Sequence, residues 1–142
     1  MDQATYDDVN LILKLYELRR EDKLRHARAW FAKFKAGTMA EFSAACPSGS
    51  DQEVYFRMVL SYWDMAASFV TRGVLNQELF LDSGAELLYA WEKIRDIVPL
   101  MRESYKNPLF AAHLEKVANA AIKRLDKANP EAYQAFSERA RA

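Results

Sequence analysis

The chain has 142 residues, and its 20 basic and 20 acidic side chains give it a formal net charge of zero at neutral pH. Hydrophobic residues make up 51% of the sequence and charged residues 28%, a composition that excludes an intrinsically disordered protein. Four glycines and four prolines are too few for the many turns of an all-β domain. We therefore predict one all-α domain over residues 1–142, a bundle of five to seven helices.

One segment near the N-terminus is basic. Residues 14–35 carry eight basic and three acidic side chains. Five of these cations form the predicted basic surface: Arg19, Arg20, Lys23, Arg25 and Arg28. Such a surface could bind an acidic partner, a nucleic acid or an acidic membrane, but we favour a solvated helix face because the whole chain has no basic excess. Apolar residues recur at helical spacing through residues 5–35, and the charged run at 19–23 leaves open whether they form one helix or two.

The segment 51–72 predicts an unusually apolar helix. Its polar positions form one narrow stripe of Arg57, Ser61, Asp64, Ser68 and Thr71. A helix that is apolar around most of its circumference lies either at the centre of a domain or between two subunits. The second of its two apolar flanks supplies the predicted interface residues: Tyr55, Met58, Tyr62, Met65 and Phe69.

Helix starts are marked by capping boxes, in which Ser or Thr is followed three residues later by Glu. Such pairs occur at 38–41, 50–53 and 83–86. The third begins a predicted helix over residues 84–106, with Trp91 on its apolar face. Because Pro99 interrupts this helix without changing its apolar register, we predict a kink there.

The charges on helix 51–72 could belong to a ligand pocket. If Arg57 and Asp64 are buried, each needs an oppositely charged partner. Glu86 and Glu92 are candidates for Arg57, and Arg95 and Arg102 are candidates for Asp64. The predicted pocket would lie between helices 51–72 and 84–106 and contain Arg57, Tyr62, Trp63, Asp64, Trp91, Arg95 and Arg102. The alternative, which we favour, is that the polar stripe faces solvent.

The sequence contains no complete catalytic constellation. The di-iron pattern Glu-x-x-His fails because Lys23 and Phe110 stand three residues before the two histidines. Cys46 is followed by proline and has no recognisable partner for nucleophilic catalysis. The carboxylate pairs Glu92/Asp96 and Asp82/Glu86 are expected to be solvated. We therefore assign no catalytic residue, no metal site and no cofactor, and we lean against an enzyme.

Three short motifs resemble an uncharacterised bacterial all-helical family, a domain of unknown function. They are Ala27-Arg28-Ala29-Trp30, Arg72-Gly73-Val74-Leu75, and the run Trp91…Pro99…Arg102. The resemblance spans residues 10–120 and implies an all-helical fold, but it implies no activity. Members of that family often carry membrane helices ahead of this region, and this chain has no run of about 20 apolar residues.

The leading functional hypothesis is a non-catalytic helical interaction module that self-associates as a homodimer. Its basis is a surplus of apolar helix faces, which one domain of this length would not cover. The alternative is a small-molecule sensor or binding protein with an aromatic pocket between helices 51–72 and 84–106. The lone cysteine, and an acidic N-terminus unlike a signal peptide, indicate a cytoplasmic protein.

Overall fold

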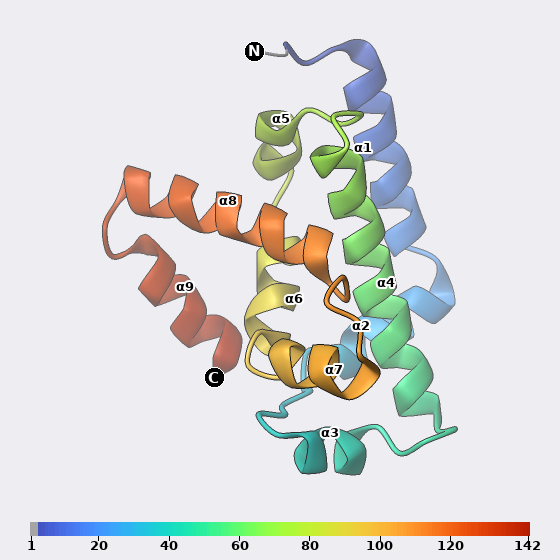
Figure 1. Cartoon of the computed structure of the whole chain (residues 1–142). Helices are drawn as coiled ribbons and strands as arrows, with labels where there is room; N and C mark the ends of the chain where they lie inside the picture. The colour runs from blue at the N-terminus through green and yellow to red at the C-terminus, as the bar shows by residue number, and fades with distance from the viewer. Residues whose placement is uncertain (1–2) are drawn as a thin grey trace.

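The computed structural model describes residues 3–142, which form nine helices and no strand (Figure 1). The all-α prediction is confirmed, but the expected five to seven helices were too few. The helices are α1 (Tyr6–Arg19), α2 (Asp22–Phe31), α3 (Met39–Ala45), α4 (Asp51–Thr71), α5 (Gln77–Asp82), α6 (Glu86–Ile94), α7 (Val98–Tyr105), α8 (Ala112–Ala128) and α9 (Ala132–Arg141). None of the helices within these residues combines the length and the hydrophobicity required to cross a membrane.

Part of the difference in helix number comes from breaks at charged or proline-containing segments. Residues 5–35 form two helices, because the Glu21 carboxylate accepts from the Leu24 amide at 3.0 Å and starts α2. The predicted kinked helix 84–106 is also two helices, α6 and α7, which run in different directions (Figure 1). Pro99 lies in the first turn of α7, where a missing amide proton breaks no intrahelical bond. It therefore stands at the start of a new helix and does not kink a continuous one.

The predicted side-chain N-caps at Thr38 and Ser50 form, but the reciprocal bonds are shifted by one residue, because Glu41 accepts from the Gly37 amide and Glu53 from the Gly49 amide. The Thr38 hydroxyl accepts from the Glu41 amide at 3.1 Å, and the Ser50 hydroxyl accepts from the Glu53 amide at 3.2 Å. The third box does not form, because the Ser83 hydroxyl donates to the Phe80 carbonyl at the end of α5. α6 consequently begins without a side-chain cap.

α4 is the central helix. It packs mainly against α2 and α8, and α8 crosses it at a steep angle (Figure 1). At the N-terminal end of α4, aromatic rings fill the core: the Phe56 ring centroid lies 5.4 Å from that of Phe34 and 4.9 Å from that of Phe42. At the other end, Asp64 accepts from the Leu114 amide at 3.0 Å and fixes the start of α8 against α4. These contacts leave α1 at the edge of the bundle, beside α4 (Figure 1).

Candidate functional site: the outer face of α1 and the adjacent cleft

α1 is attached to the bundle by one face only. Near its N-terminus, the Asp8 carboxylate accepts from the Thr5 amide at 2.7 Å and from the Asn76 amide, at the start of α5, at 2.8 Å. Near its C-terminus, the Tyr62 hydroxyl of α4 donates to the Leu15 carbonyl. Asp8 and Leu15 are buried. The inner face of α1 is therefore held at both ends by specific hydrogen bonds.

The surroundings of Asp8 and Tyr62 shift the pKa of each side chain in the direction that keeps its hydrogen bond to α1 or α5 intact. The amide of Asn76, followed by that of Thr5, lowers the pKa of Asp8 below its ordinary value of 3.8, so Asp8 remains an acceptor down to acidic pH. Burial raises the pKa of Tyr62 to about 12, so its hydroxyl keeps the proton that it donates to Leu15. Both bonds are thus intact at neutral pH.

The opposite face of α1 is apolar and open. Tyr6, Val9, Leu13 and Tyr16 expose 78%, 39%, 57% and 53% of their surface. Their 3-4-3 spacing places them in one row along the helix, which is the spacing of the contact seam in a two-helix coiled coil. We call these four residues the outer row. Large apolar side chains gathered in one exposed row, and not scattered singly, are typical of protein contact surfaces.

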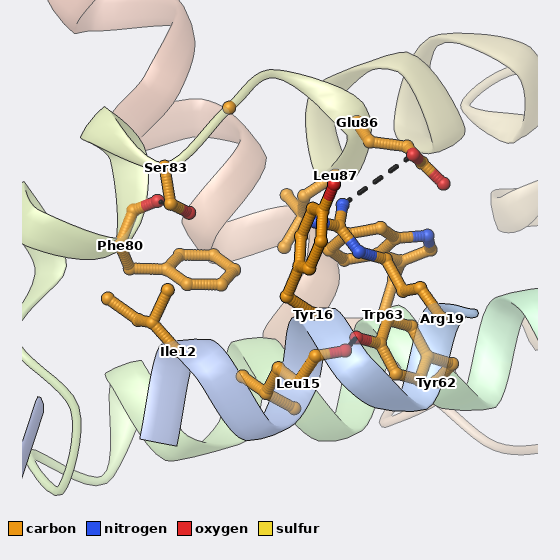
Figure 2. A pocket seen from close by; sticks show the side chains of 11 residues that line it. Ile12, Leu15, Tyr16, Arg19, Tyr62, Trp63, Phe80, Ser83, Glu86 and Leu87 are labelled. Carbon is orange, nitrogen blue, oxygen red and sulfur yellow. Dashed lines mark hydrogen bonds and ion pairs between the residues drawn. The ribbon is translucent and has the colours of Figure 1, made fainter. Parts of the chain in front are cut away.

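Arg19 continues this surface toward the core. Its guanidinium carbon lies 4.8 Å from the ring centroid of Tyr16 and 5.3 Å from that of Trp63, both within cation–π range. The guanidinium is therefore held beside two aromatic rings, one from α1 and one from α4. The same side chain forms an ion pair of 3.6 Å with Glu86 at the start of α6 (Figure 2).

Glu86 connects three helices. Arg28 of α2 binds it with two parallel hydrogen bonds of 2.6 Å each, and Arg28 also donates to the Arg19 carbonyl at 3.1 Å. This fork-to-carboxylate geometry is the strongest form of ion pair in proteins. Both side chains are only partly buried, so water screens part of the interaction. The network fixes the C-terminal end of α1 against α2 and α6.

A small cleft lies between α1, α4 and the 83–87 segment (Figure 2). It is lined by Ile12, Leu15, Tyr16, Arg19, Tyr62, Trp63, Phe80, Ser83, Gly84, Glu86 and Leu87. Its volume is about 40 Å³, which is room for about one water molecule and not for a metabolite. Tyr16 belongs to both the cleft and the outer row, so the two form one continuous surface.

The residues of the predicted ligand pocket do not come together. Tyr62 and Trp63 line the cleft, but Trp91 is buried in the core outside it. Asp64 binds the Leu114 amide. Arg57 is exposed.

The predicted ion-pair partners are engaged elsewhere. Arg95 pairs with Glu92 at 3.4 Å, while Arg102 pairs with Glu115 at 2.8 Å and donates to the Phe110 carbonyl. Because Glu86 pairs with Arg28 and Arg19, neither proposed carboxylate is left for Arg57. The polar stripe of α4 is exposed at Arg57 and Ser61, but its C-terminal half meets α8, where the Thr71 hydroxyl lies 2.6 Å from His113 Nδ1.

Most of the predicted interface flank of α4 is covered within the chain, by α1 at Tyr62 and by Trp30 of α2 at Tyr55. Tyr62 is buried and bonded to α1, and Tyr55, Met58 and Phe69 are half-buried against the core. Met65 exposes 39% of its surface. On this flank, therefore, less apolar surface is available to a partner than the sequence indicated.

The five cations of the predicted basic surface fall into two groups, one exposed and one engaged within the chain. Arg20, Lys23 and Arg25 are exposed, whereas Arg19 and Arg28 turn toward Glu86. The five side chains thus do not form one free cationic patch.

Two features were missed at the sequence level. The first is the outer row. Its 3-4-3 spacing is visible in the sequence, but the apolar positions of the inner face overlap with it, so the sequence pattern did not separate the two faces of α1. The second is Glu92, which we expected to be solvated but which is 2% exposed and accepts from Tyr133 at 2.7 Å and Ser137 at 2.6 Å. Its partners lie more than 40 residues away in α9, so no local signal revealed them.

Within residues 3–142, no three His, Cys, Asp or Glu side chains are grouped to hold a metal ion.

Comparison with known proteins identifies the family but no activity. No curated protein and no solved structure matches the chain. A family model described as Domain of unknown function (DUF4760) matches residues 4–121, from the start of α1 into α8, which confirms the resemblance found in the sequence. The chain therefore belongs to this family, the domain of unknown function DUF4760.

Proposed function

We propose that this protein is a non-catalytic interaction module that self-associates through the outer row of α1. The observation that carries this proposal is the exposure of four large apolar side chains at coiled-coil spacing on a helix that is otherwise firmly attached. Tyr and Arg are enriched in binding hot spots of protein interfaces, and Tyr16, with Arg19 beside its ring, stands at one end of the row.

The row is suited to a second copy in antiparallel orientation. In an antiparallel pair of seams, Tyr6 would face the partner's Tyr16, and Val9 would face the partner's Leu13, so every member has a counterpart. Asp8 and Arg19 are engaged within the chain, by the Asn76 amide and by Glu86, so the helix dipole provides the main electrostatic preference between orientations. Antiparallel packing brings opposite ends of the two helix dipoles together, whereas parallel packing places like ends side by side.

Disulfide crosslinking tests both the contact and its orientation. In a Cys46→Ala background, the double variant Val9→Cys/Leu13→Cys should form a covalent dimer under mild oxidation, because residues 9 and 13 would meet across the antiparallel pair. Val9→Cys alone should crosslink poorly. Efficient crosslinking of Val9→Cys alone would indicate a parallel pair, and failure of every variant to crosslink would reject self-association through α1.

The alternative, a small-molecule binding protein, is supported at a different place from the one predicted. An apolar groove of about 320 Å³ lies between the α5–α6 segment, α8 and α9. Its walls include Leu81, Leu88, Ala121, Leu125 and Phe136. The volume falls at the lower end of the range of small-molecule sites. A thermal-shift screen of apolar compounds tests this function: a hit should be lost in Ala121→Phe, which fills the groove, and the absence of any hit would remove the support.

We also propose a cytoplasmic location. It is supported by the single cysteine, Cys46, which is buried. Burial raises the pKa of its thiol to about 11, so the thiol stays protonated and unreactive.

A further inference from the structure

A second, independent feature lies at the other end of the molecule, where the end of α6 meets the loop after α2 and the C-terminal end of α9. Lys93 of α6 is only 9% exposed. Burial lowers the pKa of its ammonium group, and the positive charge of Lys35 lowers it further. Within residues 3–142, no carboxylate pairs with Lys93; its contact is the face of the Tyr89 ring, 5.4 Å from the nitrogen.

Lys93 lines a pocket of about 200 Å³. The other walls are Phe34, Lys35, Ala36, Gly37, Glu92, Asp96 and Arg141. Arg141 binds Asp96 through Nη2, but its Nη1 atom is buried and has no hydrogen-bond partner among the described residues. Two cationic side chains therefore lie at one pocket: Lys93 of α6, which is largely buried and has no carboxylate partner, and Arg141 of α9, which is partly exposed and paired with Asp96.

The charge of the pocket is positive. Three of its lining side chains are cations and two are carboxylates. The Glu92 carboxylate already accepts from Tyr133 and Ser137 and pairs with Arg95, and Asp96 pairs with Arg141. Neither carboxylate is therefore placed to neutralise Lys93 or Lys35. Burial without a carboxylate partner disfavours the charged form of an ammonium group, and an anion that joins the group offsets this cost.

We propose that this pocket binds a small oxyanion of the phosphate class. Lys93 donates hydrogen bonds to its oxygens, and Arg141 and Lys35 supply further positive charge to the pocket. Charge-assisted hydrogen bonds from Lys and Arg are the standard means by which proteins hold such anions. Binding would return the pKa of Lys93 toward its ordinary value, because the anion offsets burial and the charge of Lys35.

Titration of the purified protein with inorganic phosphate tests this site. Against sodium chloride at equal ionic strength, phosphate should bind saturably and raise the unfolding temperature. Lys93→Gln should weaken binding by at least about tenfold, since one charge-assisted contact is lost. Lys35→Gln, on a partly exposed loop, should also weaken binding without affecting folding. Lys33→Gln, which removes a nearby charge outside the pocket, should bind phosphate like the original protein.

Three results would overturn the proposal. They are the absence of saturable binding by the original protein, equal binding by Lys93→Gln, and equal loss of binding in the Lys33→Gln control. Lys93→Met supplies a further criterion. If the Lys93 ammonium group only packs against Tyr89 and binds no anion, this variant should be more stable than the original protein. In that case phosphate should raise the unfolding temperature of neither protein. Glycerol 3-phosphate distinguishes the source: tighter binding than inorganic phosphate indicates that the anion is carried on a larger molecule.

Discussion

Two leucines that are two residues apart in α1 should respond differently to substitution, one through the affinity of the dimer and the other through the stability of the monomer. Leu13 belongs to the outer row and is 57% exposed, whereas Leu15 is 5% exposed on the inner face. Leu13→Ala should weaken the dimer and leave the monomer folded. Leu15→Ala should destabilise the monomer by about 2–5 kcal/mol, as other buried leucines do.

The expected size of the Leu13 effect follows from its exposure. Truncation of leucine to alanine removes apolar groups whose full burial contributes about 2.4 kcal/mol. The 57% still exposed in the monomer corresponds to about 1.4 kcal/mol per chain, if the dimer buries all of it. Since a two-fold dimer contains two copies, the change is about 2.7 kcal/mol, or roughly a hundredfold increase in Kd.

Sedimentation equilibrium over a range of concentrations measures the Kd, and urea denaturation of each variant measures the free energy of unfolding. The reasoning fails if the original protein stays monomeric at the highest concentrations, or if Leu13→Ala leaves the Kd unchanged. It also fails if Leu13→Ala lowers the free energy of unfolding of the monomer as much as Leu15→Ala, because Leu13 would then belong to the core.

Three further predictions concern the anchors of α1. Tyr62→Phe should lower the free energy of unfolding by about 0.5–1.5 kcal/mol in urea denaturation, since it removes one buried hydrogen bond between α4 and α1. The Asp8 pKa is lowered in the folded state, so the contribution of Asp8 to stability is present above pH 3.8 and is lost as the pH falls below that value. Asp8→Asn should therefore be less stable than the original protein at neutral pH and should lose less stability in acid. Parallel acid-unfolding curves for the two proteins would contradict this. Glu86→Gln should lower the free energy of unfolding by about 1 kcal/mol, discounted for partial exposure, and an effect independent of salt would argue against an ionic origin.

The helices that the sequence predicted well are those whose signals are local. Capping at Thr38 and Ser50 depends on residues three positions apart, and the apolar periodicity of 51–72 depends on one turn following the next. Because these signals depend only on neighbouring residues, they locate the helices and their first residues without information on the tertiary structure. Ser83 shows the limit: the same capping pattern was present, but its hydroxyl was used by the preceding helix.

Tertiary structure decided which polar groups meet. Glu86 finds Arg28, 58 residues earlier, and Glu92 finds Tyr133, 41 residues later. Neither pairing follows from periodicity, because a carboxylate on a helix is compatible with solvent, a neighbouring helix or a ligand. The sequence determined that the chain is helical and that α4 is mostly apolar, since both follow from local pattern. The placement of α1 decided which of its apolar side chains are covered and which stay exposed, because burial depends on how whole helices pack.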